Sequence, residues 1–262
     1  MTALAGRTVW VTGASGGIGE ALALAAARRG ARLVLSARRE DELARVAAGC
    51  GEHAECAVLP VDLLAFDAEA VRRQAEDLLG PVDILINNAG VSQRSLVRDT
   101  DMATYRHLME LDFFAVVALS RAVLPGMVAR GGGHIATVSS VVGHISSPLR
   151  SGYAAAKHAL HGFFDAAAAE YWDEGVRFTM ACPGFVQTQV SVNALTGDGR
   201  PNARMEAGTA GGMPAAACAE RILCAVERDR YEVLMGRERA YVHLKRWAPG
   251  LFARLLRRAR MQ

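Results

Sequence analysis

The stretch TGASGGIG at residues 12–19 joins a predicted strand to a predicted helix through a turn rich in glycine. The strand, residues 7–12, is rich in β-branched and aromatic side chains, and residues 18–29 have a helical pattern. In such a turn a phosphate can approach backbone amides at a helix N-terminus, which larger side chains would block. The spacing G-x-x-x-G-x-G is weak evidence alone, but its place after the first strand predicts a nucleotide site.

Alternating strand and helix patterns along the rest of the chain predict one α/β domain. Repeated βα units give a Rossmann-type, doubly wound, mainly parallel sheet of seven strands, and no linker separates two domains. Segment 190–213 contains five glycines and is too irregular for the core, so we expect a substrate-binding loop there. The predicted strands are residues 7–12, 31–36, 55–61, 82–86, 134–138, 176–181 and 231–234.

The composition argues against several classes of protein. A net charge of +3 over 262 residues gives no reason to expect a nucleic-acid partner. Five scattered cysteines without a CxxC pair fit reduced thiols, and His158 and His161 fit a polar helix face, so no metal is predicted. We find no signal-peptide pattern and no run of the roughly 18 apolar residues that span a bilayer, so we expect a soluble, cytoplasmic protein.

The end of the second predicted strand indicates which dinucleotide fits. Residues 36–39 read Ser-Ala-Arg-Arg and contain no carboxylate. An acidic residue there would bind the ribose hydroxyls of NAD and repel a 2′-phosphate, whereas arginine offers planar donors to a phosphate. Arg38 and Arg39 therefore favour NADP(H) over NAD(H); the alternative is that they merely begin a solvated helix.

A tyrosine and a lysine four residues apart are the candidates for catalysis. Tyr153 and Lys157 share one face of a predicted helix, although an incidental surface pair would have the same spacing. The motifs TGASGGIG, NNAG at 87–90, Ser139-Ser140, and CPG at 182–184 followed by Thr188 occur in order. With them, residues 6–235 or so resemble the short-chain dehydrogenase/reductase family, and most of all its hydroxysteroid-dehydrogenase-like branch.

The resemblance implies an oxidoreductase that interconverts a carbonyl and an alcohol, with Ser140, Tyr153 and Lys157 as its catalytic set. Ser140 would hydrogen-bond the substrate oxygen, Tyr153 would give or accept the proton, and Lys157 would hold the nicotinamide ribose. The hydride belongs to the cofactor. A free phenol has a pKa of about 10, and we expect the Lys157 cation and the nicotinamide ring to lower it.

One position departs from the family pattern. Asp112 stands where the family usually has an asparagine that supports a helix distortion and a water linked to the active lysine. Aspartate is nearly isosteric with asparagine but lacks the amide donor and can carry charge. It could raise the pKa of Lys157 and slow proton relay, or be tolerated. We expect a working relay, because Ser140, Tyr153 and Lys157 are all present.

The resemblance also implies a wider set of cofactor contacts. Asp62 is expected near the adenine, Asn88 near the adenosine ribose, and Val186 and Thr188 near the nicotinamide, although a strand-terminal Asp or Thr could equally be a cap. The expected set is Gly13, Ser15, Gly17, Ile18, Gly19, Arg38, Arg39, Asp62, Asn88, Ala89, Gly90, Tyr153, Lys157, Pro183, Gly184, Val186 and Thr188.

Two rival functions and the substrate stay open at this point. A sensor or scaffold that binds NADP(H) without reacting is favoured only by Asp112, and a dehydratase or epimerase of the extended branch would need a longer C-terminal half. The substrate is expected to be a small hydrophobic ketone, aldehyde or alcohol, lipid-like or steroid-like. The expected wall residues, each of which could equally be core, are Val142, His144, Ile145, Phe185, Val192, Leu195 and Met213.

The segment 241–262 interleaves apolar and basic residues and is interrupted by Pro249-Gly250. We expect two short helices, the second with leucines on one side and arginines on the other. Such a helix can lie on an anionic membrane surface. We favour the alternative that its apolar face packs on the substrate pocket or on a neighbouring subunit, and we expect a homodimer or homotetramer.

Overall fold

A computed structural model describes residues 2–51 and 54–258 and confirms the predicted sheet. Seven strands form one sheet in the order β3-β2-β1-β4-β5-β6-β9, and every pairing is parallel. The strand order reverses between β1 and β4, and folds of this kind bind ligands at the carboxyl ends of the strands beside such a reversal. The strands are β1 Thr8–Thr12, β2 Arg32–Ala37, β3 Cys56–Pro60, β4 Ile84–Asn87, β5 Gly133–Val138, β6 Val176–Cys182 and β9 Glu232–Leu234.

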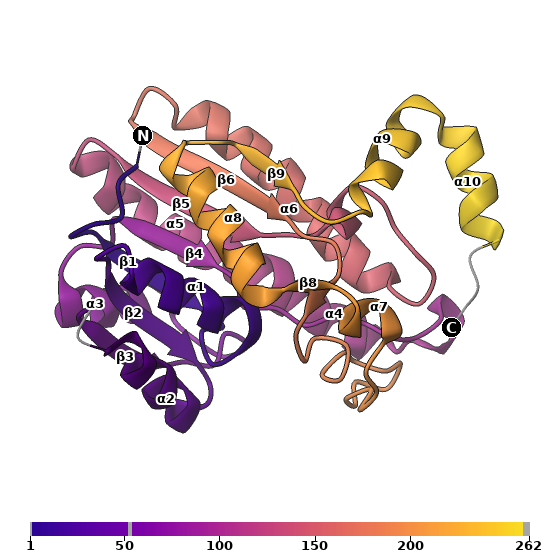
Figure 1. Cartoon of the computed structure of the whole chain (residues 1–262), viewed down its shortest axis with the longest axis horizontal. Helices are drawn as coiled ribbons and strands as arrows, with labels where there is room; N and C mark the ends of the chain where they lie inside the picture. Colours follow the sequence, from indigo (N-terminus) through magenta and orange to yellow (C-terminus); the bar gives the residue numbers. More distant parts are fainter. Residues whose placement is uncertain (1, 52–53, 259–262) are drawn as a thin grey trace.

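Helices cover both faces of the sheet (Figure 1). Helices α1, α2 and α8 contribute to the hydrophobic cluster on one face, and α3, α5 and α6 contribute to the cluster on the other. The helices of these layers are α1 Gly17–Ala27, α2 Glu40–Cys50, α3 Ala68–Leu79, α4 Met102–Met109, α5 Ala115–Ala129, α6 Ser151–Glu170 and α8 Ala215–Glu227.

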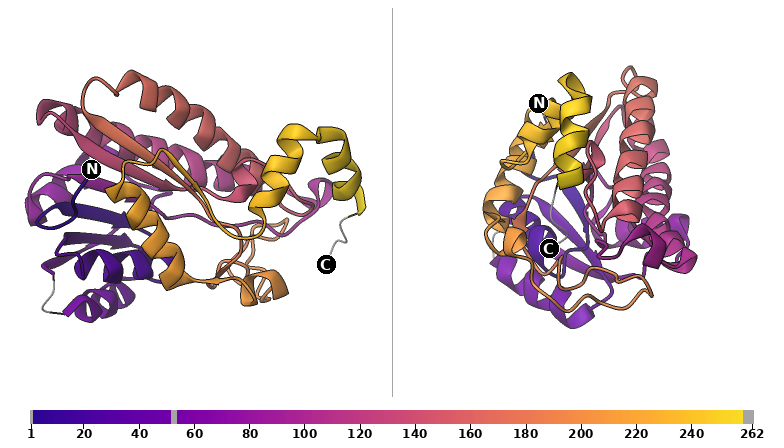
Figure 2. Two further views of the ribbon diagram at one scale, coloured as in Figure 1. Left: turned by 45° about the horizontal axis from the view of Figure 1, so that its top comes forward. Right: turned by 90° about the vertical axis from the view of Figure 1, so that its right-hand side faces the viewer.

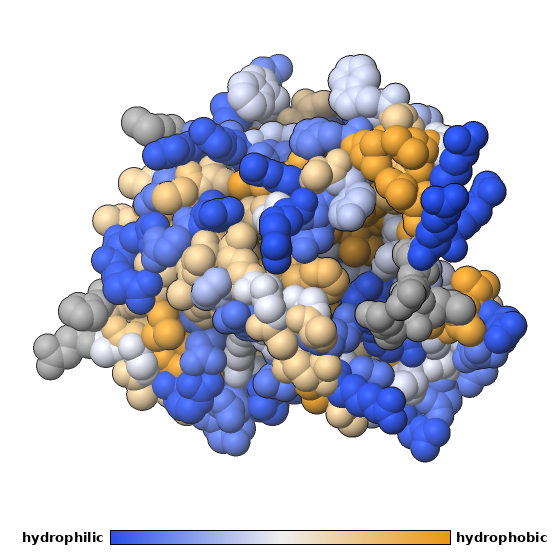
Figure 3. All heavy atoms as spheres, turned by 45° about the vertical axis from the view of Figure 1, so that its right-hand side comes forward, coloured by the Kyte–Doolittle hydropathy of each residue, from blue (hydrophilic) through white to orange (hydrophobic). Residues whose placement is uncertain are grey.

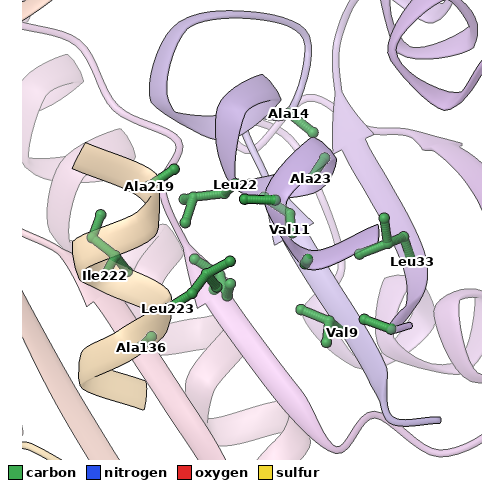
Figure 4. Close-up of a cluster of buried hydrophobic side chains, with 14 of the residues drawn as sticks. Val9, Val11, Ala14, Leu22, Ala23, Leu33, Ala136, Ala219, Ile222 and Leu223 are labelled. Carbon is green, nitrogen blue, oxygen red and sulfur yellow. The ribbon is translucent and has the colours of Figure 1, made fainter. Parts of the chain in front are cut away.

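Small side chains let α1 and α8 pack closely over the first strand. Figure 4 shows Leu22 of α1 pointing toward Leu223 of α8, with Val11 of β1 beneath them. The buried positions of α1 are mostly alanine and glycine, which permit a close helix–helix approach. Trp10, between two residues of that face, packs into the opposite cluster, as the alternation of a strand requires. The N-terminus of α1 is thereby held against the end of β1.

The helical stretch Met102–Ala129 is long and apolar enough, by length and composition, to cross a membrane. In this fold it is a core helix instead. It comprises α4, the π-helical turn η3 (Glu110–Phe114) and α5, and its residues Leu119, Val123 and Met127 are buried against the sheet.

The predicted substrate loop 190–213 follows a mostly irregular path, but it is bounded and anchored by short elements that the sequence pattern did not reveal. Strand β7 (Val186–Gln187) pairs with β8 (Met213–Pro214), and α7 (Ala207–Ala210) precedes β8. A β-bridge between Gln93 and Leu195 ties the loop to the body of the protein. Strands of two residues and a single helical turn of four are too short to show a periodicity, so the sequence pattern did not reveal these elements.

The two predicted helices of the C-terminal segment are present as α9 (Arg239–Trp247) and α10 (Pro249–Arg258), separated at Ala248. Both lie beyond one end of the sheet, as the two views in Figure 2 show. The predicted segment extends to residue 262, and its last four residues lie outside the part of the chain that the structure describes.

Candidate active site

The turn between β1 and α1 forms a cradle that only glycine can keep open. Gly13 and Gly17 have left-handed backbone, with φ of +65° and +59°. A Cβ at Gly13 would lie 2.8 Å from the Cα of Ala89, and one at Gly19 would lie 2.2 Å from the carbonyl oxygen of Gly13. A Cβ at Gly17 would lie 3.1 Å from the Thr188 methyl group. Side chains at Gly13 and Gly19 would collide with the loop after β4 or with the turn itself, so glycine keeps the turn tight enough for a phosphate to approach its backbone amides.

The N-terminus of α1 lies beside the arginines that follow β2. Gly16 is the N-cap, so no side chain caps the first amides of this helix, and Ile18 packs partly against the core. The guanidinium of Arg39 donates to the carbonyl oxygen and to the hydroxyl oxygen of Ser15, both at 3.2 Å. Arg38 is exposed next to it. The residues present therefore fit a pyrophosphate on the helix N-terminus.

Thr12 and Asn88 hold the loop after β4 against the glycine turn. The Thr12 hydroxyl accepts hydrogen bonds from the backbone amides of Asn88 at 3.0 Å and Ala89 at 3.1 Å. The Asn88 side-chain amide donates back to the carbonyl oxygens of Thr12 at 3.0 Å and Gly13 at 3.2 Å. The predicted NNAG motif thus braces the turn, and it places Ala89 beside the cradle.

The remaining expected cofactor contacts lie at other strand ends. Asp62 follows β3 and is exposed, and its carboxylate accepts a hydrogen bond from the backbone amide of Leu64 at 3.1 Å. This bond is a local contact within the turn, since the helix that follows is capped by Asp67, and a contact of Asp62 with the adenine stays a prediction. Gly184 lies between β6 and β7, Val186 is buried in β7, and Thr188 contacts the cradle as described above.

Ser140, Tyr153 and Lys157 meet at the carboxyl end of the sheet, as the motifs predicted. Ser140 follows β5, and its hydroxyl accepts from the Val142 amide and donates to the Pro183 carbonyl, both at 3.2 Å. Tyr153 and Lys157 lie on α6, with the Lys157 Nζ 5.6 Å from the centre of the Tyr153 ring. Lys157 is buried and Tyr153 is half-buried. A proton donor, a hydrogen-bond donor and a cation therefore share one site.

Asp112 pairs directly with Lys157. It is fully buried in the π-helical turn η3, its Oδ1 lies 3.2 Å from the Lys157 Nζ, and it accepts a hydrogen bond from the Val91 amide at 3.2 Å. A Cβ at Gly90 would lie 2.3 Å from the same Oδ1, so glycine is needed there. The helix distortion expected at this position is present, and it turns the carboxylate toward the lysine.

Burial and neighbouring charges shift the pKa values of these groups in opposing ways. Burial raises the pKa of Tyr153; Lys157, Ser140 and Arg150 lower it and Asp112 raises it, and the net pKa lies above the ordinary value. The predicted lowering of the phenol pKa by Lys157 is thus confirmed, although burial outweighs it, and the further lowering by the nicotinamide ring stays a prediction. Burial lowers the pKa of Lys157, but Asp112 and Tyr153 raise it more, so Lys157 stays charged. A raised pKa of Lys157 beside Asp112 is one of the two alternatives that the sequence left open, and the expected working relay stays a prediction.

Gln93 is a positioning residue that sequence reasoning missed. Its side-chain oxygen accepts hydrogen bonds from the backbone amides of Gly152 at 2.6 Å and Tyr153 at 3.3 Å, which fixes the first turn of α6. Gln93 is completely buried, and the bridge to Leu195 links it to the predicted substrate loop. The only sequence signal was its place shortly after the NNAG motif.

Two arginines and a glutamate near the start of α6 were also missed. Glu206, in the predicted substrate loop, pairs with Arg94 and, at 2.6 Å, with Arg150. The Arg150 guanidinium lies 5.8 Å from the centre of the Phe185 ring. Two cations share one carboxylate, so this wall of the site carries a surplus of positive charge.

The site and fold together define an oxidoreductase that uses a nicotinamide cofactor and acts on CH–OH groups. The family model for short chain dehydrogenases matches residues 7–198, and the chain belongs to the short-chain dehydrogenase/reductase family.

Several known proteins are similar to this chain over most of its length. It is 39% identical to "Dehydrogenase/reductase SDR family member 7B" of Mus musculus over 97% of this chain and 81% of that protein. It is 41% identical to "Dehydrogenase/reductase SDR family member 7" of Homo sapiens over 88% of this chain and 70% of that protein. A short chain dehydrogenase/reductase from Burkholderia phymatum, solved in complex with NAD, superposes with a TM-score of 0.84 at 25% identity over 96% of both chains.

Proposed function

We propose that this protein is an NADP(H)-dependent oxidoreductase that interconverts a hydrophobic ketone or aldehyde and its alcohol. The observation that carries the proposal is the grouping of Ser140, Tyr153 and Lys157 beside the glycine cradle. Asp112 contacts both Lys157 and the loop that braces the cradle. One continuous set of contacts thus joins the proton donor to the nucleotide site.

The three side chains have separate tasks in this mechanism. The Val142 amide fixes the oxygen of Ser140, whose proton can then be donated to the substrate oxygen in place of the Pro183 carbonyl. Tyr153 gives its proton to that oxygen as charge develops on it during reduction. Lys157 remains a cation, favours the phenolate that results, and binds the nicotinamide ribose. The bound cofactor supplies or accepts the hydride.

In the protein without cofactor Tyr153 keeps its proton at neutral pH, as the general acid of a reduction must. A phenol whose pKa lies above its ordinary value keeps its proton and acts as a general acid. In the oxidation of an alcohol Tyr153 must first lose that proton, so the oxidation rate should rise toward alkaline pH.

The preference for NADP(H) rests on the arginines that follow β2. Arg39 contacts Ser15 of the glycine turn, Arg38 is exposed beside it, and Ser36 and Ala37 complete a strand end that has no carboxylate. A 2′-phosphate at this strand end would meet two guanidinium groups. The Burkholderia phymatum protein was solved with NAD, so the fold alone does not decide between the two cofactors, and our proposal rests on the residues of the strand end.

The substrate is proposed to be apolar near the reacting carbon. Val142, Ile145, Phe185 and Val192 are half-buried, as side chains that line a pocket would be. Leu195 is buried in the body, which favours the core role that the sequence left open for it. Likeness to the hydroxysteroid-dehydrogenase-like branch supports a lipid-like or steroid-like compound.

Two other residues from the expected wall have different surroundings. Met213 packs against the hydrophobic cluster formed by α1 and α8. The His144 ring lies against Glu232 and Cys182.

A turnover assay separates this proposal from a sensor or scaffold. Purified protein is mixed with NADPH and a panel of ketones and aldehydes, and cofactor oxidation is followed by absorbance. We expect turnover with at least one apolar carbonyl compound. NADPH that binds but is never oxidised across the panel would favour the sensor or scaffold.

The C-terminal helices raise a second proposal, contact with an anionic membrane surface. Trp247 is 82% exposed, and Leu251 and Leu255 are also exposed, whereas Phe252 is buried. The Lys245 ammonium donates to the His144 carbonyl at 2.7 Å, so α9 is tied to the body. Figure 3 shows apolar and strongly hydrophilic side chains adjacent at this end of the molecule. The apolar face is therefore packed in part and open in part.

An open apolar face of this kind also fits a neighbouring subunit. A homodimer or homotetramer stays our proposal for the assembly, and a cytoplasmic location stays our proposal for its place in the cell.

A further inference from the structure

Four side chains capable of binding a metal gather between helix α6 and the edge strand β9. His144 follows the 3₁₀ turn η4 (Val141–Gly143), His161 lies on α6, Cys182 ends β6, and Glu232 begins β9. One ligand atom of each lies within 4.8 Å of those of the other three. Cys182 is buried, both histidines are half-buried, and Glu232 reaches the surface.

The distances between these atoms show a group that one ion can bridge. The Glu232 Oε1 lies 2.9 Å from the His144 Nε2 and 3.8 Å from the His161 Nδ1, and the Cys182 Sγ lies 3.8 Å from the His144 Nε2. A histidine binds a metal through one ring nitrogen, and with Nδ1 as the ligand atom of His161 its Nε2 stays available to the Ser139 hydroxyl. Around tetrahedral zinc, sulfur and nitrogen ligands lie about 3.6 Å apart, and nitrogen and oxygen ligands about 3.4 Å apart. The four ligand atoms lie within 4.8 Å of one another, so a metal would draw the most separated of them about 1 Å closer together.

The charges of the group also match a divalent cation. The two histidines are half-buried, and each can bind a metal as a neutral imidazole through the lone pair of one ring nitrogen. A bound metal would displace the proton of the buried Cys182 thiol. Two neutral imidazoles, a thiolate and the Glu232 carboxylate then carry two negative charges, which a divalent cation cancels.

Contacts outside the four ligands hold the histidines in place. The Ser139 hydroxyl lies 3.1 Å from the His161 Nε2, and Lys245 binds the backbone of His144 from α9. Hydrogen bonds of this kind orient histidine ligands in metal sites. His158, one turn before His161, instead bonds the Ala154 carbonyl at 2.8 Å and takes no part in the group.

We propose that His144, His161, Cys182 and Glu232 form a structural zinc site. The nitrogen and sulfur donors favour zinc over magnesium or calcium, and four protein ligands leave no open coordination position for catalysis. The metal would fasten β9 and the segment after η4 to α6 and β6. It would thereby stabilise the edge of the sheet behind Ser140, and the inference does not depend on which substrate or cofactor the enzyme uses.

Metal titration of the full chain tests the site. Protein stripped with a chelator is titrated with Zn²⁺ against a chromophoric competitor and, separately, with Co²⁺. We expect one equivalent of either metal, a thiolate-to-cobalt charge-transfer band, and a higher Tm in zinc. Cys182→Ser should abolish the band. His144→Gln or Glu232→Gln should weaken zinc binding by more than about 10-fold, because even the loss of a residue that only hydrogen-bonds a metal ligand typically weakens metal binding by about 10-fold.

Two control variants test whether zinc binding is specific to the proposed site. His158→Gln removes a histidine from the same helix, and Cys218→Ser removes a buried thiol elsewhere, so both should bind zinc as the wild type does. Circular dichroism checks that every variant is folded, and the half-exposed His144 and Glu232 variants keep the test valid if Cys182→Ser does not fold. Binding of less than half an equivalent, or binding that none of the ligand variants weakens, would overturn the site.

Discussion

Asp112 changes the electrostatics of the candidate catalytic residues from a fully buried position. Its carboxylate lies 3.2 Å from the Lys157 Nζ, so it keeps the lysine charged and opposes ionisation of Tyr153. Both effects come from one buried negative charge. A neutral residue in its place would leave the hydroxyl of Tyr153 easier to ionise.

Asp112→Asn should therefore shift the pH dependence of alcohol oxidation toward lower pH. The carboxylate raises the pKa of Tyr153, so removing its charge lowers that pKa, and the phenolate forms at lower pH. We expect kcat to be unchanged or increased. Initial rates across a pH series check this. The control is Asp83→Asn, because Asp83 lies just before β4, at the end of the strand that faces away from the candidate site. A fall in kcat below about a tenth of the wild-type value would show that the charge of Asp112 is required.

Arg38 and Arg39, which follow β2, give a second prediction at the scale of single residues. Wild-type protein should bind NADPH at least about 10-fold (~1.4 kcal/mol) more tightly than NADH. Arg38→Asp or Arg39→Asp should narrow or reverse that ratio, because a carboxylate repels the 2′-phosphate. Fluorescence titration with both cofactors measures it, with Arg73→Asp on the opposite face of the sheet as the control. Equal affinities in the wild type would refute the assignment.

At the scale of elements, sequence patterns predicted what is long and buried. Six of the seven strands of the main sheet span four to seven residues and are largely apolar, and the helices that cover it have a helical period, so burial leaves a readable pattern. Strands β7 and β8 span two residues each and leave none. The direction of the Tyr153 pKa shift depends on burial and on Asp112, which lies 41 residues earlier in the sequence.

The candidate site likewise contains some residues that the sequence could predict and others that it could not. The motif residues of the glycine turn, Ser140 and the Tyr153–Lys157 pair were predictable because their spacing is local. The role of Gln93 and the grouping of His161 with Cys182 and Glu232 were not, since these contacts join segments that only the folded sheet brings together. For that reason a search along the helix alone, from His158 to His161, gave no sign of a metal site.

The C-terminal helices give a prediction at the same scale. The full chain should sediment with anionic vesicles if exposed Trp247, Leu251 and Leu255 enter the interface and the arginines bind lipid headgroups. A chain ending at Arg239 should lose this association, and neutral vesicles are the control. Sedimentation that is absent, or that survives the truncation, would leave α9 and α10 only a packing role.

At the scale of the whole molecule, the parallel sheet brings four distant motifs to one edge. The glycine turn, the loop after β4, Ser140 and the first turns of α6 are separated by up to 140 residues in sequence, yet all follow carboxyl ends of neighbouring strands. The reversal of strand order between β1 and β4 opens the crevice between them. The topology thus places the proposed proton donor beside the proposed nucleotide site.

The central claim is that Tyr153 donates the proton in an NADP(H)-dependent carbonyl reduction, and Tyr153→Phe tests it most directly. The variant keeps the ring and the contact with Lys157 but lacks the hydroxyl proton. With a substrate found in the carbonyl panel, kcat should fall by about 10²-fold or more while the Kd for NADPH stays near the wild-type value. Tyr241→Phe, an exposed tyrosine on α9, should leave both unchanged. Retention of more than about a tenth of the wild-type kcat in Tyr153→Phe would contradict the assignment.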